Sequence, residues 1–150
     1  MSTTAIREAT AADSNRLAEL RYEFRSEVGG FVEDKHTFIR RCSAWMANNL
    51  SDNWKCWAAV CNGEIVGQVW AGLVGKLPNP NGHPELHGYI TNLYVRPECR
   101  GGVGSKLLAQ ALAWLKKKRV DAVILWPTPR SRTLYKRHGL KEPEDILELR

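Results

Sequence analysis

Residues 93–108 read LYVRPECRGGVGSKLL, and this segment is the most informative part of the sequence for predicting the fold. A predicted strand, Leu86–Val95, is ended by Pro97, and an amphipathic helix is predicted over Gly104–Lys118. The first N–H groups of a helix have no intrahelical partners and lie at the positive end of its dipole. Glycines at 101, 102 and 104 leave these donors accessible, so the turn is expected to bind an anion such as a phosphate.

The two most familiar nucleotide-binding motifs do not fit this turn. The P-loop pattern GxxxxGK[ST] does not occur, and GxGxxG fails because its last position, counted from Gly102, is Leu107. The turn also follows several predicted strands, whereas a dinucleotide-binding turn opens its βαβ unit. Both of these nucleotide-binding folds are therefore disfavoured.

The stretch resembles the acetyl-CoA-binding motif of the GNAT acetyltransferase superfamily, in which an apolar strand and V-x-P precede [QR]-x-x-G-x-[GA] at the start of a helix. Val95-Arg96-Pro97 and Gly102-Val103-Gly104 match this motif. The connecting loop is one residue shorter than is usual in the family, and allowing for that deletion Arg100 takes the [QR] position. The run LYKRHGL at 134–140 is similar to the family's L-Y-x-x-x-G-F, with Leu140 in place of Phe.

The other sequence patterns agree with this resemblance. They predict a strand at Ala5–Glu8, helices from Asp13 to Gly29 and over Asp34–Leu50, and strands Trp57–Val60 and Ile65–Val74 joined by a tight Asn62-Gly63 turn. They further predict a strand buried on both faces at Asp121–Trp126, a helix at Ser131–His138 and a final strand within Ile146–Leu149. The expected fold class is α/β (an α+β arrangement), with a central mixed β-sheet flanked by helices, as in the GNAT-like acyl-CoA N-acyltransferase fold. Residues 1–150 are expected to form a single acetyltransferase domain.

The resemblance implies an acetyl-CoA-dependent N-acetyltransferase that acts on a primary amine of a small molecule, a peptide or a protein. It implies that acetyl-CoA is the cosubstrate and that Tyr135 is the general acid that protonates the departing thiolate. The main chain of the central strand would pair with the pantetheine arm. The implied cosubstrate-binding residues are Leu93, Tyr94, Val95, Arg100, Gly101, Gly102, Val103, Gly104 and Ser105.

The acceptor and the general base are less clearly indicated. Glu85, His87, Tyr89 and Asn92 lie on or before the central strand, and none of them is singled out as the base. The acceptor site is expected between the first two helices and the proline-rich loop Gly75–Glu85. The charges of the first two helices have both signs and nominate no acceptor, and a homodimer is left open.

Composition limits the other classes of function. The formal net charge is +6, and residues 96–150 hold 13 lysines and arginines against 6 aspartates and glutamates. This excess leaves a basic nucleic-acid-binding module open as an alternative. The resemblance leaves a second alternative open, which is a GNAT-like sensor that binds CoA without turnover. No nucleic-acid motif accompanies the charge, so nucleic acid is not the expected partner.

The four cysteines lack metal-ligand spacing, so no metal is expected, and no apolar run approaches the length of a membrane span. We expect a cytoplasmic protein with reduced thiols and no membrane partner.

Overall fold

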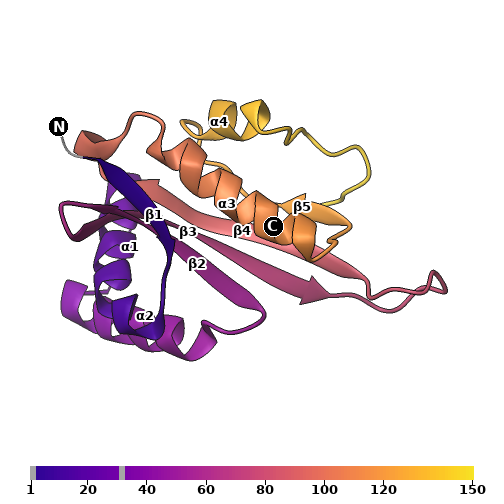
Figure 1. Cartoon of the computed structure of the whole chain (residues 1–150), viewed down its shortest axis with the longest axis horizontal. Helices are drawn as coiled ribbons and strands as arrows, with labels where there is room; N and C mark the ends of the chain where they lie inside the picture. The colour runs from indigo at the N-terminus through magenta and orange to yellow at the C-terminus, as the bar shows by residue number, and fades with distance from the viewer. Residues whose placement is uncertain (1–2, 31–32) are drawn as a thin grey trace.

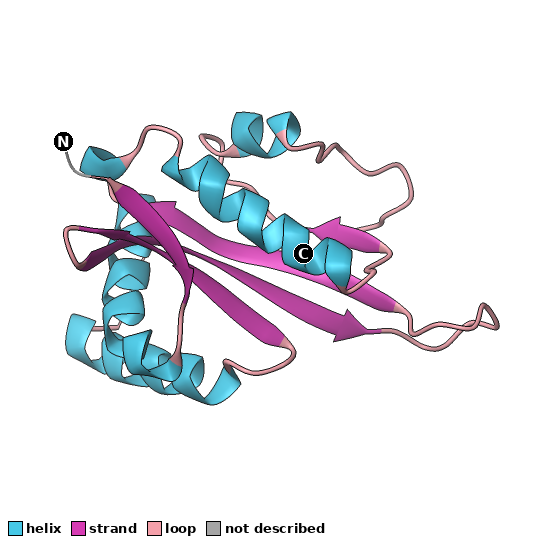
Figure 2. Cartoon of the chain, in the orientation of Figure 1, coloured by secondary structure: helices cyan, strands magenta, loops and turns pink. Residues whose placement is uncertain are grey.

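The computed structural model describes residues 3–30 and 33–150. Their strands form a five-stranded sheet in the order β1-β2-β3-β4-β5, with α1 and α2 on one face and α3 and α4 on the other (Figure 1 and Figure 2). The pairs are antiparallel except for β4 and β5, which run parallel, so the predicted mixed sheet flanked by helices is confirmed. The elements are β1 (Thr4–Glu8), α1 (Ser14–Val28), α2 (Lys35–Asn49), β2 (Trp54–Cys61), β3 (Glu64–Gly75), β4 (Leu86–Val95), α3 (Val103–Lys117), β5 (Ala122–Ile124) and α4 (Arg132–Arg137), with short 3-10 turns at Ala11–Asp13 and Pro97–Cys99.

Both faces of the sheet are buried, because successive residues of a strand point to opposite faces. In β2, Cys56 and Ala58 join the core beneath α1 and α2, whereas Trp57 and Ala59 join the core beneath α3. The second core is completed by the buried stripe of α3, which consists of Leu107, Leu108, Ala111 and Leu115. These cores hold α1 and α3 against opposite faces of the same central strands.

Polar contacts position α1 on the sheet. The buried side-chain amide of Gln68 in β3 donates to the carbonyl of Leu17 at 2.9 Å, and its oxygen accepts from the indole N–H of Trp70 at 2.8 Å. Arg96, just beyond β4, donates to both carboxylate oxygens of Glu23 at 3.0 and 2.6 Å. As a result α1 is held against β3 and against the end of β4.

The Asn62-Gly63 turn joins β2 to β3 as predicted. Asn62 and Gly63 have φ values of 53° and 76°, and positive φ at both central residues is what a type I′ turn requires. The glycine and asparagine therefore set the register of this hairpin.

A bulge changes the course of β4. Gln68 is paired with Tyr94 and Trp70 with Thr91, so one residue of β3 lies opposite two residues of β4, and Asn92 takes a φ of 57°. Pairing of β4 with β5 ends just before this bulge, at Tyr89 and Ile124. A bulge bends the strand that carries it, so β4 separates from β5 here.

Two predictions about the last third of the chain are wrong. The strand predicted at Asp121–Trp126 is only Ala122–Ile124, and it is not buried on both faces, since Ala122 is exposed and Trp126 is 59% exposed. It pairs only with β4, so a continuous apolar run here marks an edge strand. No strand forms at Ile146–Leu149, where Leu147 and Leu149 are almost fully exposed. In the described part of the chain, no helix combines the length and the hydrophobicity needed to cross a bilayer.

Candidate active site

The separation of β4 from β5 leaves one edge of β4 open. The N–H of Arg96 donates to the carbonyl of Val66 in β3 at 2.9 Å. Because the peptide is planar and trans, the carbonyl of Val95 points the opposite way, toward the open edge. Main-chain groups alternate along a strand, so those of Leu93 face the same side as those of Val95. Leu93 and Val95 therefore offer the unpaired edge that was predicted for the pantetheine arm.

Arg100 lies against this edge. Its Nε donates to the carbonyl of Val95 at 2.8 Å, and its guanidinium lies 3.7 Å from the carboxylate of Glu27 and 5.8 Å from the ring centre of Tyr94. The side chain therefore occupies the last acceptor of the open edge. A ligand that pairs with the end of β4 would meet the Arg100 guanidinium directly.

Tyr94 is directed away from the open edge. Its main-chain groups alternate with those of Val95 and face β3, and its ring stacks on Phe24 of α1 with the ring centres 5.1 Å apart. Its hydroxyl donates to Glu27 at 3.2 Å, and burial together with the Glu27 charge raises the pKa of Tyr94 to about 12. Among the predicted cosubstrate-binding residues, Tyr94 is thus placed as a contact between β4 and α1.

The glycine-rich turn presents a row of free amide groups. Gly101 and Gly102 have φ values of 116° and 88°, and Gly102 is the N-cap of α3. Within the described residues, no acceptor lies opposite the N–H groups from Gly101 to Ser105, and the first bond across the helix boundary is from Lys106 N to Gly102 O at 3.1 Å. These amides lie at the positive end of the α3 dipole, where an anion is stabilised.

The side chains around this turn have different surroundings. The Val103 side chain belongs to the core beneath α3, whereas a Cβ on Gly104 would lie 3.5 Å from Leu134 of α4, which is an ordinary contact. The Ser105 hydroxyl lies 2.7 Å from Nε2 of His138, beyond the end of α4. The turn is therefore held between the core and α4, while its amides stay accessible. Arg96 is close to this turn in the sequence, but its guanidinium is paired with Glu23 on α1.

A cavity of about 220 Å³ joins the open edge to Tyr135. It lies where β4 leaves β5, and α1 closes it on one side and the start of α4 on the other. Tyr135 is only 7% exposed and shares this cavity with Leu93. The lining residues are Arg21, Phe24, Arg25, Tyr89, Ile90, Thr91, Asn92, Leu93, Trp126, Thr128, Ser131 and Tyr135.

Burial controls the ionisation of Tyr135. Desolvation raises its pKa to about 12, although a hydrogen bond with Ser131 opposes the shift. The hydroxyl therefore stays protonated throughout the neutral range. A protonated hydroxyl next to an open strand edge can donate a proton or a hydrogen bond to an anion that forms in the cavity.

The family model that describes the acetyltransferase (GNAT) family matches residues 16–140 of the chain. The chain belongs to the GNAT acetyltransferase family. This match begins within α1 and ends at Leu140, three residues after the end of α4. It therefore includes the cavity, the open edge and the glycine-rich turn. No curated protein sequence matches the chain.

Solved structures share the GNAT fold over nearly the whole chain. A predicted acetyltransferase from Clostridium acetobutylicum, solved with acetyl-CoA, has 23% identity and a TM-score of 0.76, and the match covers 99% of this chain and 96% of that one. A GCN5-related N-acetyltransferase from Ralstonia eutropha has 22% identity and a TM-score of 0.76, with 98% of each chain covered. Glucosamine-6-phosphate N-acetyltransferase from Arabidopsis thaliana has 16% identity and a TM-score of 0.71, with 99% and 98% covered.

Only some of the residues considered for the general base of this GNAT family member line the cavity. Tyr89 and Asn92 line the cavity, whereas Glu85 and His87 do not. Glu85 is buried beside Lys76 and Asn81 at the opposite end of β4. No carboxylate and no imidazole is among the described residues that line the cavity.

The acceptor side of the cavity differs from the expectation. The helix α1 contributes to it as expected, but the loop Gly75–Glu85 does not line it and extends away from the body of the molecule (Figure 1). Lys76 at the base of this loop pairs with Asp121 at 3.0 Å, and this ion pair holds the base of the loop beside β5. Position in the sequence near the central strand was therefore a poor guide to proximity in space.

Sequence reasoning missed several lining residues. Trp126, Thr128 and Ser131 come from the segment between β5 and α4, which carries no recognisable motif. Thr128 and Ser131 bond to each other, with their hydroxyls 2.9 Å apart, and so form the turn that leads into α4. Arg21 and Arg25, by contrast, are among the charges of both signs noted on the first two helices, where no single charge was selected. Their spacing of four residues places them on one face of α1.

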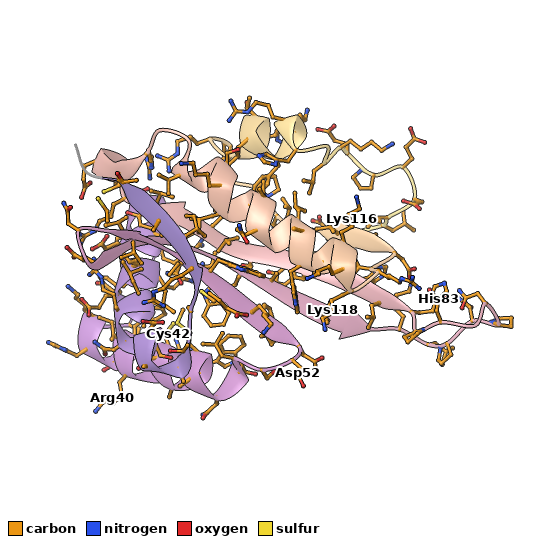
Figure 3. The ribbon with its side chains drawn as sticks, in the orientation of Figure 1. Arg40, Cys42, Asp52, His83, Lys116 and Lys118 are labelled. Atoms are coloured by element: carbon orange, nitrogen blue, oxygen red, sulfur yellow. The ribbon has the colours of Figure 1, made fainter. Side chains whose placement is uncertain are left out.

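The basic residues of the segment 96–150 do not lie in one place. Arg130 lies 3.9 Å from Glu27 of α1, near the open edge, whereas others lie at the far end of α3. Lys116 and Lys118 lie at the C-terminal end of α3, on the side of the molecule away from the glycine-rich turn (Figure 3). Lys118 Nζ lies 5.9 Å from the ring centre of Trp114, and cations at this helix end are favoured by the dipole. Their place at this end of α3 thus accounts for the positive charges of Lys116 and Lys118.

Proposed function

We propose that this GNAT family member transfers the acetyl group of acetyl-CoA to a primary amine of a small molecule or peptide, and that residues 1–150 act as one domain in doing so. The observation that supports this most directly is the cavity that the open edge of β4 shares with the buried hydroxyl of Tyr135. The solved neighbour from Clostridium acetobutylicum holds acetyl-CoA on the same fold, which supports the choice of cosubstrate.

Each part of the cosubstrate has a group of the chain suited to it. The amides from Gly101 to Ser105 suit the pyrophosphate, since they are free donors at a helix N-terminus. The outward carbonyl of Leu93 and the outward main-chain groups of Val95 suit the amide groups of the pantetheine arm, which can pair as an added strand, and this leaves the N–H of Leu93 for the thioester oxygen. Arg100 would exchange its bond to Val95 for contact with this ligand.

The chemistry requires an oxyanion donor and an acid. A neutral amine nitrogen attacks the thioester carbonyl carbon, and the N–H of Leu93 on the open edge donates to the oxygen as negative charge develops there. The C–S bond then breaks, and Tyr135 gives its proton to the thiolate sulfur. The nitrogen loses its extra proton to water, which restores the proton of Tyr135.

The experiment that tests this function is acceptor-dependent release of the CoA thiol from acetyl-CoA, with mass spectrometry of the acetylated amine. We expect a primary amine to accelerate thiol release and to gain an acetyl group in equal amount. If acetyl-CoA binds but no amine in a broad panel is acetylated, the chain is a CoA sensor. If acetyl-CoA does not bind, while nucleic acid binds with a steep salt dependence, the nucleic-acid module replaces this proposal.

A further inference from the structure

The wall of the cavity formed by α1 carries two arginines and no acid. Arg21 and Arg25 both line the cavity at the open edge of β4. They also line an adjoining hollow of about 300 Å³ between α1 and the start of α2. Glu33 lines this hollow as well, but its carboxylate is paired with Arg41 at 2.7 Å. A molecule that reaches the open edge from this side therefore passes both guanidinium groups.

These two arginines differ from the other arginines near α1. Arg16, Arg96 and Arg41 each lie within 2.7 Å of a carboxylate oxygen, belonging to Glu64, Glu23 and Glu33 respectively. By contrast, over residues 3–30 and 33–150 no carboxylate oxygen comes within 4.0 Å of Arg21 or Arg25 in the structure. The acidic partners that α1 and its neighbours provide elsewhere are missing at the cavity.

The contacts that Arg21 and Arg25 do make leave their charge uncompensated. Arg21 donates to the side-chain oxygen of Asn92 at 3.2 Å, which is a neutral acceptor at the β4 bulge. Both guanidinium groups lie over the ring of Phe24, at 5.8 and 5.7 Å from its centre. Burial, reinforced by the like charge of Arg25, lowers the pKa of Arg21. A guanidinium nevertheless stays protonated in proteins, so an anion would stabilise this pair.

We infer that the acceptor is a small primary amine that also carries an anionic group, a carboxylate or a phosphate, which Arg21 and Arg25 bind while the amine reaches Leu93 and Tyr135. The inference rests on the proposed function, and it specifies the class of substrate. The arginine fork matches the paired oxygens of such groups. Amines with several positive charges would be repelled from this wall, since like charges disfavour each other in a partly buried site.

The rest of the lining agrees with a small polar acceptor. Tyr89 and Trp126 form an edge-to-face pair with ring centres 5.8 Å apart, and they provide an apolar side to the cavity. Thr91, Thr128 and Ser131 provide hydroxyl groups nearby. The cavity and the adjoining hollow have the size of a metabolite site rather than of a protein-binding surface.

The test compares matched pairs of amines in the thiol-release assay. Glycine is compared with glycinamide, 2-aminoethyl phosphate with ethanolamine, and putrescine serves as the polycation. The variants are Arg25→Gln, which removes no hydrogen bond found in the structure, and Arg21→Gln. Arg40→Gln is the control, because Arg40 is exposed on α2 and points away from the molecule (Figure 3).

We expect wild type to use the anionic member of at least one pair with a KM about 10-fold or more lower than that of its neutral partner. Arg25→Gln and Arg21→Gln should each remove most of this preference, whereas Arg40→Gln should keep it. Intrinsic differences in amine reactivity cancel, because the same pair is compared across variants. The pair that responds shows whether the anion is a carboxylate or a phosphate.

Other results would overturn the inference. Equal or better use of the neutral amines or of putrescine would do so, as would a preference that survives both arginine substitutions. A weaker affinity for acetyl-CoA in the arginine variants, with an unchanged KM for the amine, would assign the arginines to the cosubstrate. If no amine is acetylated, the proposed function fails, and calorimetric titration with N-acetylglycine and inorganic phosphate then decides the anion site. Binding that is lost in Arg25→Gln but not in Arg40→Gln would support it, and no binding to wild type would reject it.

Discussion

At the scale of single residues, the environment of Tyr135 determines what it can do. Its hydroxyl is buried against the cavity, and desolvation raises its pKa to about 12. A thiol has a pKa of about 8.5 in water, which is below that of Tyr135, so Tyr135 keeps its proton until the thiolate forms beside it. Desolvation of the thiolate in the cavity raises the pKa of the thiol toward that of Tyr135, as the proton transfer requires. The residue therefore has the protonation state that an acid requires at neutral pH.

We predict that Tyr135→Phe lowers kcat by about 10²- to 10⁴-fold, since this is the usual contribution of a general acid. The affinity for acetyl-CoA should change little, because the ring and its packing are retained. Thiol release at saturating acetyl-CoA and amine measures the effect. Tyr94→Phe is the comparison, because Tyr94 is a similarly buried residue whose hydroxyl bonds Glu27 on the α1 side, and the change should leave kcat within a few-fold of wild type.

The pH profile provides a second check on Tyr135. Activity requires its protonated form, and a pKa of about 12 keeps that form dominant up to about pH 11. The rate should therefore rise with pH as the amine becomes neutral, and it should not fall again between pH 8 and 10. A descending limb near pH 10 that disappears in Tyr135→Phe would mean that the hydroxyl is not desolvated.

At the scale of elements, the N-terminus of α3 is suited to a phosphate rather than to the acyl arm. Its free amides lie from Gly101 to Ser105, whereas the groups suited to the arm lie on β4. Acetyl-CoA at 100 times its Kd should stabilise the fold by about 2.7 kcal/mol. At about 2–4 °C per kcal/mol, this is a rise in Tm of about 5–10 °C. Acetyl-pantetheine, which lacks the phosphates, should give little shift at the same concentration, and an equal shift would contradict a phosphate site at this turn.

The contact between α1 and the end of β4 should make stability depend on pH. Hydrogen bonding from Arg96 lowers the pKa of Glu23 in the folded chain. A carboxylate whose pKa is lowered by folding adds stability above its unfolded pKa of about 4.3, and this stability is lost as the pH falls through the folded pKa.

We predict that Glu23→Gln lowers Tm at pH 7 by up to about 4 °C, the range of a partly exposed ion pair, since the two side chains are 27% and 34% exposed. The difference from wild type should shrink below about pH 4 and vanish at lower pH. Thermal melts at a series of pH values measure it. Glu144→Gln, in the exposed C-terminal segment, should match wild type throughout, and a Glu23 effect that persists at pH 2 would show that the ion pair is not its cause.

At the scale of the whole molecule, the sheet holds the open edge in place through the close approach of β3 to β4. A Cβ on Gly67 would lie 2.9 Å from the carbonyl oxygen of Tyr94 and 3.0 Å from a methyl of Val95. Only glycine allows this approach, because backbone atoms cannot move aside as a flexible side chain can. The residue opposite the open edge thus fixes how far β4 stands from β3.

We predict that Gly67→Ala destabilises the fold by about 1–3 kcal/mol, as overpacking usually does, and that it weakens acetyl-CoA binding by displacing Val95. The expected fall in Tm is about 2–12 °C. Gly75→Ala, at the end of the same strand, should melt close to wild type, since a Cβ there meets no atom within 4 Å. Equal melting temperatures for the two variants would contradict the tight contact.

Local features of the sequence determined the elements and the glycine-rich turn. The apolar stripe of α3 and the Asn62-Gly63 hairpin depend on residues that are close in the chain, so their patterns could be recognised without the fold. The free amides of the glycine-rich turn follow equally from a helix that starts at a glycine. The family resemblance rested on these same residues, and the family match confirms it.

Two features depend on the tertiary structure and could not be predicted from local patterns. They are the residues that line the acceptor side of the cavity and the extent of the last strands. The run at 121–126 is apolar, but its burial depends on how many neighbours the strand has, and β5 has only β4. Arg21 and Arg25 look like ordinary helix charges until the β4 bulge and the end of β4–β5 pairing place a cavity beside them. Arg96 and Arg100 are close in sequence to the glycine-rich turn, yet both form ion pairs with glutamates of α1. Such partners come from segments about 70 residues away, and local periodicity carries no information about contacts at that separation.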